Sequence, residues 1–209
     1  MATDHEDPRV TRSRALILDA ATHVFLDRGY HGATVDLVAD VAGVAKRTVY
    51  NVYGEKDALF RATILRSIEV ADRFSASLAA QVREVADPAS ELPELGARLA
   101  VSVLVGPVLP LRRLLVMESR AFPELAVEYR RRAPEAVMRA LAEVFTQLAA
   151  RGRLRPGDPV LTAEHFAFLA MGADLDRGMF AAEQYTVDEV RRRALAGMDA
   201  FLRAYATAG

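Results

Sequence analysis

The sequence contains no cysteine, and this absence removes disulfides, thiolate metal sites and cysteine nucleophiles from consideration. Lysine is almost as scarce, because Lys46 and Lys56 are the only two and arginine supplies the remaining permanent positive charges. Long apolar runs are also missing, since charged residues interrupt every candidate for a membrane span. The first ten residues, MATDHEDPRV, are polar and acidic and lack an apolar signal core. We therefore predict a cytoplasmic protein with no membrane partner.

A global excess of charge is missing as well, because the formal net charge is −1. Residues 1–61 contain eight Lys and Arg residues against nine Asp and Glu residues, so this segment is not basic. Composition alone therefore does not predict binding to nucleic acid. Any affinity for DNA must come from a local group of basic side chains, doubled by dimerisation.

Helical periodicity dominates the 209 residues, of which 52% are hydrophobic. Because no run of alternating β-branched residues predicts a sheet, the expected fold class is all-α, with about nine helices. The expected helices span residues 12–28, 35–42, 45–53, 55–85, 90–105, 109–121, 123–151, 159–176 and 187–206. Gly29, Gly43 and Gly54 are expected to end the first three, and Pro134 is expected to kink or split the helix over 123–151.

The two short helices around Gly43 fit a helix-turn-helix unit. On the second of them, Val49 and Val52 point to one side. Lys46, Arg47, Tyr50 and Asn51 share the other side, because residues four apart are neighbours on a helix. Cationic, phenolic and amide groups are the ones that bind base edges and phosphates. The outward side of this helix therefore predicts contact with DNA.

Lys56 lies in the first turn of the long fourth helix, where the helix dipole disfavours a cation. A phosphate bound at this helix terminus would reverse that preference. The two lysines would then bind the DNA backbone from opposite ends of VYNVYG. The alternative is that both are ordinary solvated side chains in an arginine-biased sequence.

Residues 14–60, RALILDAATHVFLDRGYHGATVDLVADVAGVAKRTVYNVYGEKDALF, resemble the N-terminal domain of the TetR/AcrR (tetracycline-repressor) family of bacterial transcriptional regulators. The markers are Phe25, Gly29-Tyr30, Thr34, Val38-Ala39, Ala42-Gly43-Val44, Thr48-Val49-Tyr50 and Lys56-Asp57-Ala58-Leu59. The resemblance implies phosphate contacts by Thr34, Thr48, Tyr50 and Lys56, and base reading by Lys46, Arg47 and Asn51. The sequence departs from the family pattern at three positions. Ala45 replaces a serine or threonine cap, Arg47 replaces a small residue, and Val52 replaces an aromatic residue.

The resemblance also implies a division into a DNA-binding domain over residues 1–55 and a ligand-binding and dimerisation domain over 56–209. Residues 117–172 resemble a recurring C-terminal type of the family more loosely. The predicted ligand-binding residues are Met117, Phe122, Tyr129, Met138, His165, Phe166 and Met171. Tyr129 and His165 would orient the polar end of a ligand. Methionine and phenylalanine at helical spacing are more often plain core, which is the alternative for the others.

The last two predicted helices carry apolar stripes that would pair with a symmetry mate as a four-helix interface. The stripe residues are Phe166, Leu169 and Ala170, followed by Leu195, Met198, Phe201 and Leu202. The predicted partners are thus a second copy of the chain, a palindromic double-stranded operator and a small, largely apolar effector. The predicted function is a ligand-responsive transcriptional regulator that acts as a repressor.

Two other functions are alternatives to this one. An enzyme would need a catalytic or nucleotide-binding motif, and the sequence has no Gly-x-Ser-x-Gly, P-loop or dinucleotide glycine pattern. His23 and Asp27 lie one helical turn apart, with His31 beyond them, which is a weak metal-site pattern. A helical scaffold without a DNA role leaves the outward side of residues 46–51 unexplained. We therefore predict no catalytic residues, no metal and no cofactor.

Overall fold

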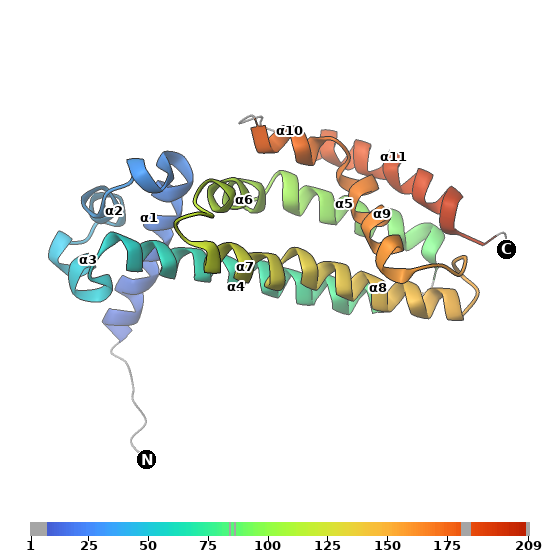
Figure 1. The fold of residues 1–209 in the computed structure, drawn as a ribbon, viewed down its shortest axis with the longest axis horizontal. Helices are drawn as coiled ribbons and strands as arrows, with labels where there is room; N and C mark the ends of the chain where they lie inside the picture. Colours follow the sequence, from blue (N-terminus) through green and yellow to red (C-terminus); the bar gives the residue numbers. More distant parts are fainter. Residues whose placement is uncertain (1–7, 84, 86, 181–184, 208–209) are drawn as a thin grey trace, which may run out of the picture. The chain divides into compact units, whose positions relative to one another are not determined.

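The computed structural model describes residues 8–83, 85, 87–180 and 185–207 (Figure 1). These residues form helices α1 to α11, and outside the helices one isolated bridge joins Leu154 to Ala206. The chain divides into two compact units. The N-terminal unit comprises residues up to Glu69 together with Leu114–Ala126, and the C-terminal unit comprises Val70–Arg113 and the chain from Val127 onward. The all-α prediction is confirmed.

The N-terminal unit is built on three helices and the first part of a fourth. These are α1 (Pro8–Gly32), α2 (Val35–Ala42), α3 (Lys46–Tyr53) and α4 (Lys56–Arg83). Regular helix breaks at Gly29, whose φ of 69° is open to glycine, and one more turn reaches Gly32. Residues 56–69 pack with this unit because Leu59 and Phe60 are fully buried and Ile64 almost so. The unit therefore extends beyond the predicted domain boundary at residue 55.

The short segment Leu114–Ala126 joins this unit through an aromatic cluster. The ring of Phe122 lies 4.8 Å from that of Phe60 and 5.1 Å from that of Tyr30, and Phe25 lies 5.0 Å from Phe60. Arg61 stacks over Phe122 and forms an ion pair with Glu124. Tilted and edge-on ring packing, together with this cation–π contact, explains why residues 114–126 belong with the N-terminal unit.

The C-terminal unit contains most of α5 to α11, and the helices predicted over 123–151 and 159–176 are each two helices in it. The helices are α5 (Pro88–Leu104), α6 (Val108–Met117), α7 (Pro123–Arg132), α8 (Pro134–Ala150), α9 (Pro159–Met171), α10 (Asp174–Phe180) and α11 (Val187–Tyr205). Pro134 splits the predicted helix over 123–151, as expected for a residue without a backbone N–H. Gly172 (φ 58°) splits the helix predicted over 159–176, which raises the number of helices among the described residues from nine to eleven.

The core of the C-terminal unit lies between α5, α8, α9 and α11. Phe145, Phe166 and Phe201 are buried there with ring centroids 5.2–5.6 Å apart. Burying such side chains contributes about 1.5–3 kcal/mol each. No single helix in the described part of the chain is long and apolar enough to cross a membrane, although α5 and α6, bent by 50°, pass that test as a pair.

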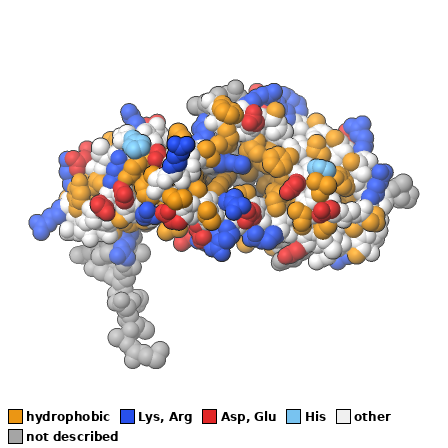
Figure 2. Space-filling view, viewed as in Figure 1, with side chains coloured by type: hydrophobic (Ala, Val, Ile, Leu, Met, Phe, Trp, Pro, Cys, Tyr) orange, Lys and Arg blue, Asp and Glu red, His pale blue; other side chains and the backbone are white. Residues whose placement is uncertain are grey.

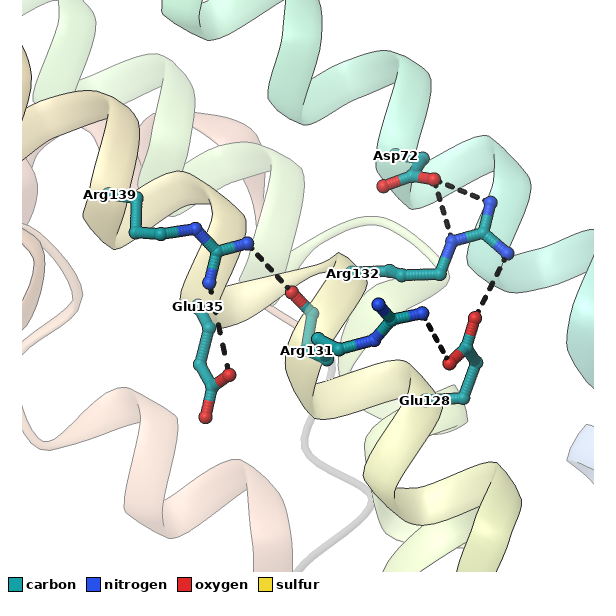
Figure 3. A network of polar contacts seen from close by, with 6 residues as sticks. All are labelled: Asp72, Glu128, Arg131, Arg132, Glu135 and Arg139. Atoms are coloured by element: carbon teal, nitrogen blue, oxygen red, sulfur yellow. Dashed lines mark hydrogen bonds and ion pairs between the residues drawn. The ribbon is translucent and has the colours of Figure 1, made fainter.

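An ionic network connects α4 to α7 and α8 within the C-terminal unit (Figure 3). Arg132 on α7 donates from Nε (2.8 Å) and Nη2 (2.5 Å) to one carboxylate oxygen of Asp72 on α4. Glu128 accepts from Arg131 at 2.8 Å and from Arg132 at 3.4 Å. Arg139 on α8 donates to the carbonyl oxygen of Arg131 at 3.2 Å. The network thus fixes the end of α7 against α4 beside the break at Pro134.

Candidate DNA-binding interface

The turn between α2 and α3 has the local chemistry of a helix-turn-helix. The Thr34 hydroxyl caps α2 by accepting from the backbone N–H of Leu37 at 3.1 Å. Gly43 adopts the left-handed conformation (φ 65°, ψ 31°), and the next N–H, that of Val44, donates to Ala39 at 3.1 Å. Ala45 caps α3 without a side-chain hydrogen bond. The sequence therefore sets this turn largely through Thr34 and Gly43.

Helix α3 divides its residues between the core and the surface as the sequence predicts. Val49 is 1% exposed, whereas Tyr50 is 49% exposed. Lys46, Arg47 and Asn51 are exposed as well, and Thr48 is half-buried. We call Lys46, Arg47, Tyr50 and Asn51 the reading face of α3. Its outward orientation is confirmed, and its contacts with DNA remain predictions.

Both lysines have partners within the protein. Lys46 Nζ lies 2.5 Å from a carboxylate oxygen of Asp36 on α2, and this hydrogen bond raises the pKa of the lysine, with Asp36, Asp40 and Tyr50 also favouring the charged form. Lys56 Nζ lies 4.4 Å above the ring of Tyr30 and donates to the carbonyl oxygen of His31 at 3.5 Å. Neither pairing is evident from the sequence, because ten and twenty-six residues separate the partners Asp36 and Tyr30 from their lysines.

Tyr30 is itself held in place by a second contact. Its hydroxyl donates to Asp57, and burial together with this hydrogen bond raises the pKa of Tyr30 to about 12. The phenol, neutral at physiological pH like an ordinary tyrosine, offers Lys56 the face of its ring. Arg47, in contrast, has no ion pair or side-chain hydrogen bond among the residues that the structure describes. Arg47 can therefore bind DNA without first breaking a contact within the protein, whereas Lys46 is paired with Asp36.

Comparison with known proteins identifies both parts of the chain. Residues 17–63 match the family model for bacterial regulatory proteins of the tetR family. Residues 90–207, more than half of the chain, match the model for the C-terminal domain of AefR-like transcriptional repressors. The chain belongs to the TetR family of transcriptional regulators. It is a DNA-binding regulator and not an enzyme, which removes the enzymatic alternative.

Individual relatives agree with the family assignment. The HTH-type transcriptional regulator YhgD of Bacillus subtilis strain 168 is 28% identical over 157 residues, which are 72% of this chain and 76% of YhgD. A TetR-family regulator from Mesorhizobium loti MAFF303099 is 28% identical, with a TM-score of 0.83 over 96% of this chain and 100% of that one. The flavonoid-responsive regulator FrrA is 26% identical, with a TM-score of 0.61 over 95% of this chain and 100% of FrrA.

The predicted ligand-binding residues of this TetR-family chain are distributed over both units. Met117 (65% exposed) and Phe122 (3% exposed) belong to the N-terminal unit, where Phe122 lies in the aromatic cluster. In the C-terminal unit Tyr129 is buried, which raises its pKa, and Met138 is half-buried against the core. The structure therefore does not bring Met117 and Phe122 together with the other five within one unit.

The other three predicted ligand residues lie around α9. Phe166 and Met171 are part of the core, whereas His165 is exposed and its Nδ1 is hydrogen-bonded to the hydroxyl of Tyr205 on α11. A pocket of about 150 Å³ opens beside Phe145, Leu154 and Thr162. This volume is below the roughly 300 Å³ at which pockets begin to enclose a drug-sized ligand. None of the seven predicted residues lines it.

The predicted apolar stripes of α9 and α11 are partly core. Phe166, Ala170, Met198 and Phe201 are at most 3% exposed, so they are unavailable to a partner, and assigning them to an interface was wrong. Helical periodicity alone does not say which of two apolar faces meets the chain's own core. The exposed apolar side chains are Val160, Leu161, Phe168 and Leu169 on α9, with Val187 and Leu195 on α11. Figure 2 shows hydrophobic side chains gathered on the face of this unit over α9.

Proposed function

We propose that this TetR-family regulator is a repressor that binds a palindromic operator as a homodimer and is released by a small, largely apolar effector. The reading face of α3 carries the proposal for DNA, because four polar side chains suited to bases and phosphates are exposed on one side of a short helix. The similarity of residues 90–207 to repressor C-terminal domains supports the repressing role. Such a protein acts in the cytoplasm, on chromosomal DNA.

In this proposal Lys46, Arg47 and Asn51 face base edges, while Thr34, Thr48, Tyr50 and Lys56 contact phosphates. Arginine and asparagine form paired hydrogen bonds to guanine and adenine, respectively, and hydroxyl groups and lysine suit phosphate oxygens. Because the N-terminal segment is not basic overall, two copies acting together would supply the affinity. Two reading faces on successive major grooves would contact half-sites about 34–36 Å apart, or a multiple of that spacing.

The C-terminal unit would supply the dimer contact and the effector site. The exposed apolar side chains of α9 and α11 are the proposed dimer surface, and Tyr129 and Met138 are the proposed effector contacts within the C-terminal unit. FrrA, which has a similar fold, is named as responsive to flavonoids, and this supports an aromatic or otherwise apolar effector. To reverse a 99:1 preference for the DNA-bound state, the effector must favour the released state by about 5.5 kcal/mol.

Genomic footprinting of the protein in its native cells tests this function. We expect occupied sites that contain an inverted repeat, including one near the protein's own gene. Deletion of the gene should raise transcription from the occupied promoters if the protein is a repressor. Lower transcription would assign an activating role, and the absence of any preferred site would refute operator binding.

Replacing Arg47 with alanine is expected to weaken operator binding by about 1–3 kcal/mol and to relax preference at one base position in each half-site. The reason is that Arg47 is exposed on the reading face and has no described partner to leave. Randomised-site selection followed by titration measures both effects. Arg28→Ala is the matched control, because Arg28 is an exposed arginine of α1 paired with Asp27 at 2.7 Å. An unchanged base preference in Arg47→Ala would limit Arg47 to contacts with the DNA backbone.

A further inference from the structure

The ion pair between Asp36 and Lys46 places a carboxylate beside the reading face. Asp36 lies in the first turn of α2, and its oxygen is 2.5 Å from Lys46 Nζ. The side chains are 50% and 56% exposed, so both reach solvent at the surface that would meet DNA. Lys46 is also the first residue of α3, where the helix dipole disfavours a cation. The carboxylate of Asp36 compensates for that position and favours the conformation in which the lysine points toward α2.

Lys56 provides the contrast within the same unit. Its partners are the ring of Tyr30 and the carbonyl oxygen of His31, and both are neutral. When Lys56 moves to a phosphate, it leaves no unpaired negative charge behind. When Lys46 moves to a phosphate, it leaves the carboxylate of Asp36 beside the DNA, where like charges repel each other. The two lysines therefore differ in how freely they can follow the DNA backbone.

An ammonium group has three N–H donors, and the contact with Asp36 uses one of them. The other two donors remain available to a guanine edge that lies opposite the reading face in the operator. On DNA without that base, an untethered lysine would swing to the nearest phosphate and add sequence-independent affinity. A lysine paired with a carboxylate must break that pair to swing to a phosphate, whereas a base contact through its remaining donors keeps the pair.

We propose that Asp36 is a specificity-determining residue, which tethers Lys46 for base contact and keeps it from binding phosphates on non-operator DNA. This inference rests on the proposed function, in which the reading face of α3 meets the operator. Asp40 is another charged group near the pair, and it lies one turn further along α2 and is exposed. Asp40 acts on Lys46 through its charge, without a hydrogen bond to it among the described contacts.

The test compares Asp36→Asn with the parent on operator DNA and on random duplex over a range of salt concentrations. Asp36→Asn frees one lysine in each protomer of a dimer. The slope of log affinity for random duplex against log salt concentration should therefore become steeper by about 1.8. The gain in affinity for random duplex should then be about tenfold larger at 50 mM than at 200 mM salt. Operator affinity should stay equal or fall, so the ratio of specific to non-specific affinity falls.

Two further variants separate the tether from a general effect of charge. Asp40→Asn removes the same charge from the same helix, and it should change binding to operator and to random duplex alike. In a Lys46→Ala background, Asp36→Asn should change the affinities for operator and random duplex alike, as Asp40→Asn does. The reason is that no lysine remains to be released. Circular dichroism of each variant confirms that the helices are retained.

The outcomes are distinct. An unchanged specificity ratio in Asp36→Asn, or the same change in Asp40→Asn, would overturn the role of Asp36. Equal weakening of binding to both DNAs would also overturn it, since Asp36 would then support every contact that Lys46 makes. A parent protein that prefers no sequence in the selection would instead refute the proposed function itself, and this inference with it.

Discussion

Replacing Phe168 with aspartate is expected to give a folded monomer that no longer binds operator DNA. Phe168 on α9 is 57% exposed, with Leu161 and Leu169 exposed on the same helix. Leu161 and Phe168 are seven residues apart and therefore share one side of the helix. In a symmetric dimer through this surface, each new carboxylate would be buried close to its own symmetry mate. An unpaired buried charge of this kind costs several kcal/mol.

Sedimentation, circular dichroism and operator titration together measure this result. The variant should sediment as a monomer, keep its helical signal, and fail to bind operator at concentrations that saturate the parent. Phe201→Asp is the matched control, because Phe201 on α11 is fully buried between Phe145 and Phe166. That control should unfold the C-terminal unit rather than release a folded monomer. A Phe168→Asp protein that remains dimeric with full affinity would place the dimer contact elsewhere.

Replacing Gly197 with alanine is expected to destabilise the protein by about 2 kcal/mol, although alanine is the better helix former. A Cβ atom at residue 197 would lie 1.9 Å from the carbonyl oxygen of Leu169, so α11 approaches the backbone of α9 too closely for any side chain. Backbone cannot rotate out of the way, and overpacking of this kind costs roughly 3 kcal/mol. The gain in helix propensity, about 1 kcal/mol, offsets only part of that cost.

Urea unfolding of the parent and the variant measures the difference in the free energy of unfolding. Gly96→Ala is the control, because a Cβ atom there would meet only the side chain of Met198, its sulfur at 2.3 Å and its Cγ at 2.6 Å, and no backbone. Met198 is buried, but an unbranched methionine adjusts more easily than backbone, so we expect a smaller loss from that substitution than from Gly197→Ala. If the two variants lost equal stability, a general intolerance of side chains between these helices would explain both results, and the close backbone contact would not.

The sequence by itself determined the local elements of this protein. Capping by Thr34, the left-handed turn at Gly43 and the break at Pro134 each depend on one residue and its immediate neighbours, and all were predictable. The outward orientation of Lys46, Arg47, Tyr50 and Asn51 follows from helical geometry once Val49 is assigned to the core. The resemblance to the TetR family depends on these local markers. For the same reason it can be recognised from about fifty residues of the sequence.

Tertiary structure decided the features that depend on partners distant in the sequence. Which of two apolar stripes on α9 and α11 became core was set by packing against α5 and α8, and Phe201 was consequently misassigned to the surface. Phe122 lies in the N-terminal unit because it meets Tyr30 and Phe60, about sixty residues or more away. Asp36 lies against Lys46 because the turn at Gly43 folds α3 back across α2. Periodicity specifies the face of a helix, but only the folded chain specifies what that face meets.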